Sequence, residues 1–177
     1  MDDENKTVDE KIVDTTFKSI IDTFSEHPDF QNKLSSTNAL IIPSSIFDNQ
    51  DTYFPQGTID FYQYLHSNSP PELNIDIAVL DEKYAEFPKY NETIEIATII
   101  VKYVCLPIVL PIISRYIYDK YLSKNNEEKH EIKSEILITK NDTTVAYKYC
   151  GPAKTYEKLM LDYLKNVNEI TEGSEEN

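Results

Sequence analysis

The sequence predicts an α+β protein with short strands, amphipathic helices and one long apolar helix. Three observations support this prediction. Residues 94–118 are almost uncharged and apolar, residues 132–150 contain two alternating runs around a turn, and residues 9–26 repeat apolar side chains at helical spacing. Hydrophobic residues make up 40% of the 177-residue chain, which is enough for a folded core.

The N-terminal region, residues 1–93, is predicted to begin with an amphipathic helix over residues 9–26. Apolar side chains such as Ile12, Phe17 and Phe24 recur at intervals that place them on one face of a helix. Pro28 either ends this helix or begins a short second turn. Such a stripe most often faces the protein's own core.

Short strands and loops are predicted for the rest of this region. Residues 38–42 (NALII) indicate a strand, and residues 43–57, which hold two prolines, a glycine and several turn formers, indicate a surface loop. Thr58 is a candidate N-cap for a short helix over residues 58–66. Apolar and polar residues alternate over residues 73–79, which predicts a half-buried strand.

The C-terminal region is predicted to form a ββα unit. Two alternating runs, residues 132–139 and 143–150, lie close enough to pair as a hairpin, and a helix is expected over residues 153–167. The unit spans residues 123–168 and is expected to pack around a small core of its own. Residues 169–177 are strongly acidic and are predicted to form a tail.

The apolar stretch, residues 94–122 in the predicted division of the chain, admits two interpretations. Of the 19 residues between Glu95 and Arg115, eleven are Ile, Leu or Val, and Lys102 carries the only charge. A helix of this length spans about 28 Å, close to the hydrocarbon thickness of a bilayer. Lys102 and the two prolines oppose insertion, so hydropathy alone leaves a membrane segment and a buried core helix both open.

Flanking residues favour the membrane interpretation. Tyrosines and phenylalanines lie on both sides of the stretch, as in an interfacial belt, and basic residues are more frequent after it, which predicts a cytoplasmic C-terminal unit. The candidate residues of this membrane or core segment are Lys102, Pro107, Pro111, Arg115, Tyr116 and Tyr118. Lys102 is expected either to extend its ammonium group toward the membrane surface or to lie on a polar groove with Glu95.

Charge and composition exclude several classes of function. A net charge of −14 repels nucleic acids, and it is compatible with a basic protein partner. Only three glycines occur, which disfavours a glycine-rich nucleotide loop, and the three histidines have no second ligand at metal spacing. No catalytic residue, metal site or cofactor is therefore predicted, and no signal peptide is recognised at the N-terminus.

These observations favour a non-enzymatic interaction or regulatory protein that acts through protein contacts. We expect it at the cytoplasmic side of a membrane, with a soluble cytoplasmic protein as the alternative. Contact with a membrane and formation of a homo-oligomer are both compatible with the sequence. The alternative function is a soluble acidic inhibitor or immunity-type protein that covers a basic surface of a partner, for example as a DNA mimic.

Overall fold

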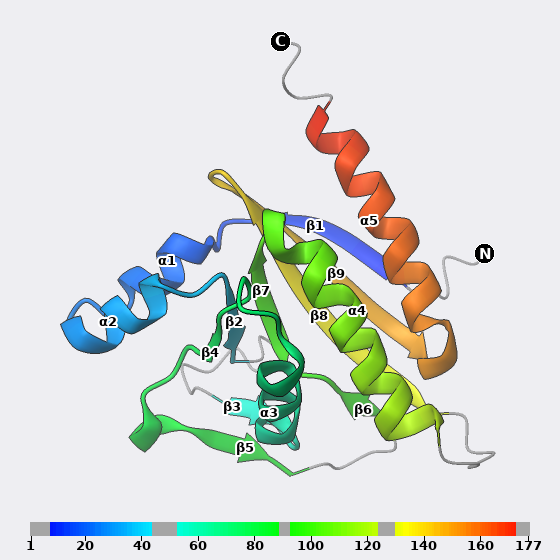
Figure 1. The fold of residues 1–177 in the computed structure, drawn as a ribbon, viewed down its shortest axis with the longest axis horizontal. Helices are drawn as coiled ribbons and strands as arrows, with labels where there is room; N and C mark the ends of the chain where they lie inside the picture. Colours follow the sequence, from blue (N-terminus) through cyan, green and yellow to red (C-terminus); the bar gives the residue numbers. More distant parts are fainter. Residues whose placement is uncertain (1–7, 44–52, 89–92, 124–129, 173–177) are drawn as a thin grey trace, which may run out of the picture.

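A mixed seven-stranded sheet organises the computed structural model, which describes residues 8–43, 53–88, 93–123 and 130–172 (Figure 1). Helices pack on both faces of this sheet, so the protein is α+β. The strands of the main path, in spatial order, are β1 (Val8–Val13), β9 (Thr143–Pro152), β8 (Glu131–Lys140), β7 (Thr98–Lys102), β2 (Ala39–Ile42) and β4 (Ile75–Ile77). A short strand, β6 (Ile94–Glu95), also pairs with β8.

Two crossover connections place helices on the same face of the sheet. The neighbours β7 and β8 are parallel, as are β2 and β4, so each connection must cross the sheet and return. Crossovers between parallel strands are right-handed in nearly all proteins. Strands β2 and β7 are antiparallel, and the crossover from β7 to β8 runs across the sheet in the opposite direction to the crossover from β2 to β4. Two right-handed crossovers related in this way place their helices on the same face. These helices are α3 (Thr58–Asn68) and α4 (Leu106–Ile117). They contact each other through the rings of Phe61 and Tyr116, whose centroids are 5.0 Å apart. The last helix, α5 (Tyr156–Glu172), joins this layer.

The opposite face carries a smaller layer. Helices α1 (Phe17–Asp22) and α2 (Pro28–Ser35) connect the edge strand β1 to β2 and lie to one side of the sheet in Figure 1. Their apolar side chains pack on the central strands, so that Leu34 of α2, Leu40 of β2 and Ile100 of β7 are fully buried. Two short helices cover only part of this face, so the layer is incomplete.

The prediction of one long apolar helix over residues 94–118 is wrong. The stretch contains β6, β7, a short 3-10 turn and then α4, which begins at Leu106 and is followed by a π-helical turn, η3 (Tyr118–Leu122). The β-branched residues before Lys102 suit a strand that is buried on both faces. Pro107 lies in the first turn of α4, where its missing N–H costs no helical hydrogen bond.

None of the helices in the described residues is long and apolar enough to cross a membrane. Helix α4 has 12 residues, which corresponds to about 18 Å, whereas a hydrocarbon core is about 30 Å thick. The prediction of a transmembrane helix is therefore wrong. The apolar residues instead contribute to a helix and to strands of the sheet, whose two faces carry separate core clusters.

One extra residue separates β6 from β7. Ile94 lies opposite Ile132, whereas Ile99 lies opposite Ile136, so residues 96–98 face only residues 134–135 of β8. This is a β-bulge, which reverses the alternation of side chains along the strand. After it, Ile99 and Val101 face the core beneath α4, while the residues that alternate with them face the layer of α1 and α2.

The prediction of an amphipathic helix over residues 9–26 is also wrong. Val8–Val13 form β1, which pairs antiparallel with β9, and helix α1 begins only at Phe17. The side chain of Thr16 caps α1, which fixes the boundary. Apolar residues at helical spacing here divide between two elements, because pairing with β9 overrides the local periodicity.

Other boundaries also shift. Tyr53–Pro55 form β3, which pairs with β5 (Ala85–Phe87), so part of the predicted loop at 43–57 is a strand; residues 44–52 lie outside the described residues. Gly57, not Thr58, occupies the N-cap of α3, with φ at +90°. The Glu86 carboxylate accepts hydrogen bonds from the backbone N–H groups of Gly57 (3.3 Å) and Ile59 (3.4 Å).

The C-terminal hairpin lies where the sequence predicts it. Strands β8 and β9 pair antiparallel around a two-residue turn, in which Asn141 takes a φ of 54°. The hairpin is not a separate unit, because β8 also pairs with β7 and β9 also pairs with β1. Helix α5 extends to Glu172, so the predicted tail is helical over 169–172; residues 173–177 lie outside the described residues.

Two valines three residues apart distinguish this arrangement from a continuous helix. In a helix they would share one face, but here Val101 is fully buried in β7 and Val104 is 76% exposed. We expect Val101→Ala to lower the free energy of unfolding by about 2 kcal/mol and Val104→Ala to change it by less than about 0.5 kcal/mol. Urea denaturation measures both, and equal losses would contradict the assignment.

Candidate functional site

A groove of about 680 Å³ lies between α1 and the end of the central strands. One wall comes from α1 and α2, and the other comes from the residues that follow β7 and from the turn of the β8–β9 hairpin. Its lining residues include Phe17, Ile21, Lys102, Tyr103, Val104 and Lys140. The groove therefore combines apolar and cationic side chains.

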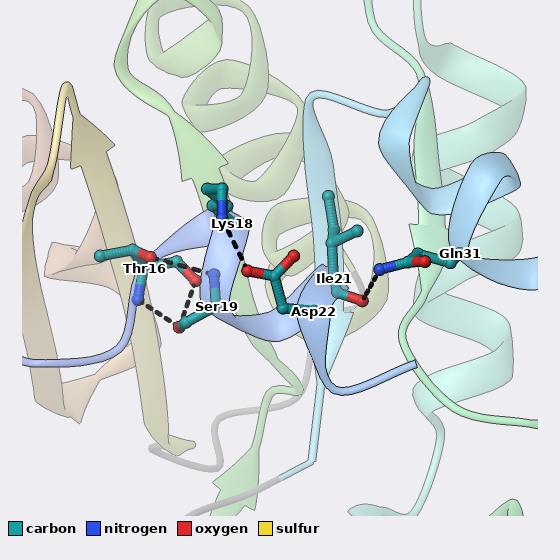
Figure 2. Close-up of polar contacts among 6 residues, drawn as sticks. All are labelled: Thr16, Lys18, Ser19, Ile21, Asp22 and Gln31. Carbon is teal, nitrogen blue, oxygen red and sulfur yellow. Dashed lines mark hydrogen bonds and ion pairs between the residues drawn. The ribbon is translucent and has the colours of Figure 1, made fainter. Parts of the chain in front are cut away.

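The α1 wall is fixed by a capping box (Figure 2). Thr16 Oγ1 accepts a hydrogen bond from the backbone N–H of Ser19 at 3.0 Å, and Ser19 Oγ accepts one from the backbone N–H of Thr16 at 2.8 Å. Gln31 Nε2 of α2 donates to the carbonyl of Ile21 at 3.4 Å, which ties the two helices together. A six-residue helix is thereby held in one orientation beside the groove.

An ion pair lies at the rim of the same wall. Lys18 Nζ and Asp22 Oδ2 are 2.8 Å apart, one helical turn from each other (Figure 2). The hydrogen bond and charge of Asp22 raise the pKa of Lys18, and Asp142 on the facing turn adds to this effect. Both side chains are largely exposed, so the pair contributes little to stability.

Two further lysines point their ammonium groups at aromatic rings. Lys102 Nζ lies 4.8 Å from the ring centre of Phe17, and Lys140 Nζ lies 5.0 Å from that of Tyr103. Such cation–π contacts hold a charged group against an apolar surface. Neither ammonium group forms an ion pair with a carboxylate of the described residues. The groove thus holds two cations whose charge is not neutralised within the described structure.

Of the six residues predicted for the apolar segment, only Lys102 lines the groove. Pro107, Pro111, Arg115 and Tyr118 lie on the exposed side of α4 and of the turn that follows it, and Tyr116 is buried against α3. Lys102 does not share a groove with Glu95, because the two residues are seven positions apart on nearly extended chain, a separation of about 20 Å. That prediction assumed a helix, in which the two positions would share a face.

Tyr116 belongs to an aromatic cluster between α3, α4 and η3. Its ring meets those of Phe61, Tyr64 and Tyr121. Burial raises the pKa of Tyr116 to about 12, and the charge of Asp60 adds to the increase while a hydrogen bond with Tyr121 reduces it. At neutral pH this phenol is protonated, which suits a structural role.

Possible metal ligands and the buried Cys105 bear on catalysis. No group of three or more His, Cys, Asp or Glu within them could hold a metal ion. Burial raises the pKa of Cys105, which keeps the thiol protonated at neutral pH, and this is the opposite of what a nucleophile requires. The arrangement of the groove supports binding by charge and apolar contact.

Comparison of the chain with protein-family models, with curated proteins and with solved structures found no significant match.

Apart from Lys102, sequence reasoning missed the residues that line the groove, among them Phe17, Tyr103 and Lys140. Lys140 occurs beside a predicted hairpin turn and Lys102 lies within a predicted helix, so nothing local connects the two. The connection comes from the parallel register, in which Lys102 pairs with Thr139. Because that register joins residues 37 positions apart, only the tertiary structure reveals the site.

A double-mutant cycle tests the contact between Lys102 and Phe17. We expect Lys102→Met and Phe17→Leu to be coupled by about 0.5–1 kcal/mol in the free energy of unfolding, because each change alone removes the cation–π attraction. Urea denaturation of the wild type, both single variants and the double variant gives the coupling. Additive losses would show that Lys102 does not interact with the ring.

Alkaline pH tests the burial of Tyr116. Its folded pKa is above the ordinary value of 10.0, so its contribution to stability is present below pH 10 and is lost as the pH rises toward about 12. The free energy of unfolding should fall over this range, and the fall should be smaller in Tyr116→Phe. An identical dependence on pH in the two proteins would contradict this prediction.

Proposed function

We propose that this chain is a protein-binding module that takes an acidic peptide segment of a partner in the groove beside α1. The single observation that supports this most is the pair Lys102 and Lys140, whose ammonium groups lie over rings without a carboxylate partner in the described residues. A carboxylate beside either ammonium group would gain a charge-assisted hydrogen bond. The exposed Val104 and the nearby Tyr103 offer apolar contact to a neighbouring side chain.

The strongly negative charge of the whole chain does not prevent such binding. Electrostatic interactions across water are largely screened beyond about 8 Å at physiological ionic strength, so carboxylates elsewhere on the surface have little effect in the groove. Within the lining, lysines outnumber aspartates, since Lys18, Lys102 and Lys140 face Asp22 and Asp142. The local charge therefore favours a short acidic segment.

An acidic inhibitor of a basic surface receives less support. Such a protein would gather carboxylates on one face, but the exposed carboxylates of the described residues occur on separate elements. Examples are Asp9 on β1, Asp29 on α2, Glu82 on a short turn and Asp162 on α5. We therefore develop the groove as the site of function.

Binding of a synthetic peptide tests the proposal. The probe is a fluorescently labelled peptide in which two glutamates flank a leucine, and its affinity is measured by anisotropy at physiological salt. We expect Lys102→Ala and Lys140→Ala each to weaken binding by about tenfold, because a hydrogen bond to a charged group contributes about 1.5 kcal/mol. A peptide with glutamines in place of the glutamates should bind much more weakly.

Lys33→Ala is the matched control, because it removes the same charge outside the groove. Lys33 lies on α2 and forms an ion pair with Asp76 at 3.1 Å. Its loss should leave peptide affinity unchanged. The proposal is overturned if the acidic peptide does not bind. It is also overturned if Lys33→Ala changes peptide affinity as much as Lys102→Ala and Lys140→Ala do.

A further inference from the structure

The outer edge of β1 is an open end of the large sheet. In the described part of the chain β1 pairs with β9 on one side and with no strand on the other. An edge of this kind presents unpaired backbone groups, which can add a strand from another chain. Ile12 on this edge is 72% exposed, the second largest exposure among the large apolar side chains of the described residues.

The hairpin turn determines which backbone groups of β1 point outward. Lys140 and Thr143 flank a two-residue turn, so they must exchange both hydrogen bonds of their pair. Every second residue of β9 from Thr143 therefore bonds to β8, and the residues between them bond to β1. The β1 residues that face these are Asp9, Lys11 and Val13, so the N–H and C=O groups of Val8, Glu10 and Ile12 point away from the sheet.

This geometry limits how two copies of β1 could pair about a twofold axis. Outward-pointing residues must lie opposite outward-pointing residues, and the longest overlap puts Val8 opposite Ile12 of the second copy. Asp9 of each copy then lies opposite Lys11 of the other, which gives two such pairs in the dimer. Both are pairs without mutual hydrogen bonds, in which the Cα atoms of opposite residues are closer together. Glu10 meets its own counterpart in the wider, hydrogen-bonded pair.

The opposite charges extend a row that is already present on the sheet. Glu135 of β8 lies opposite Lys148 of β9, and Lys148 lies opposite Asp9 of β1, so the sign alternates across three strands. These side chains border a second hollow of about 340 Å³, on the face that α1 and α2 leave uncovered. Lys11 of a second copy supplies the next cation in the row. A shift by two residues would instead bring Lys11 against Lys11.

We propose that two copies of this chain associate through antiparallel pairing of their β1 strands, with Asp9 of each copy opposite Lys11 of the other. The two sheets then become one continuous sheet. Charged residues on an edge normally discourage pairing, but here Asp9 and Lys11 match twice across the twofold axis, against one opposing pair of Glu10 side chains. Ile12 gains Val8 of the second copy as an apolar neighbour on the same face.

Charge exchange tests the proposal on the full chain. Asp9→Lys places lysines opposite each other in a homodimer, and Lys11→Asp places aspartates opposite each other. Each variant alone should have a dimer association constant lower by roughly tenfold or more, measured by sedimentation equilibrium. An equal mixture of the two variants should recover dimers. In the heterodimer the lysine introduced at position 9 meets the aspartate introduced at position 11, and the unchanged Asp9 of one variant meets the unchanged Lys11 of the other.

Ile12→Pro is a second variant that distinguishes edge pairing from loss of folding. The N–H of residue 12 points outward, so proline there removes a donor from the dimer without breaking a bond to β9. We expect a folded monomer by circular dichroism and sedimentation. The proposal is overturned if the wild type stays monomeric at every concentration, if dimers persist in these variants, or if the mixture forms no heterodimers.

Discussion

The parallel pairing of β7 with β8 is the constraint on which the rest of the structure depends. Two parallel neighbours cannot be joined by a tight turn, so the chain between them must leave the sheet and cross one face. The apolar residues after Lys102 supply the helix for that crossover. Helix α4 then sets the position of α3 and of the aromatic cluster around Tyr116, and it forms one side of the main core.

The bulge between β6 and β7 has an equally large effect on the site. Side chains alternate between the faces of a strand, so one extra residue reverses the direction of every residue that follows. Ile99 and Val101 consequently enter the main core, and Lys102 points toward Phe17 on the other face. A strand of the same sequence without the bulge would direct Lys102 into apolar surroundings, where an ammonium group is costly.

The incomplete layer on the second face links the two proposals. Helices α1 and α2 are too short to cover the whole sheet, so one part of this face borders the lysine groove and another part is left open next to β1. A peptide in the groove would contact Lys102 and Lys140, whereas a second copy would pair with Asp9 and Lys11. The two surfaces share no lining residue.

Several elements depend on local signals and could be predicted from the sequence. Alternation and a turn predicted the hairpin of β8 and β9, and apolar periodicity with a turn before it predicted α5, since these signals act over a few residues. The strand at 39–42 and the helix after Gly57 were also visible in this way.

Long-range pairing determines how the apolar stretch divides between strand and helix and where Lys102 points. Short apolar runs fit a buried strand and a buried helix equally well, and the choice here comes from pairing with β8, more than thirty residues away. The same applies to β1, whose apolar residues have helical spacing until β9 pairs with them. The groove joins α1, the end of β7 and the hairpin turn, so it exists only once long-range register and the bulge bring these three segments together.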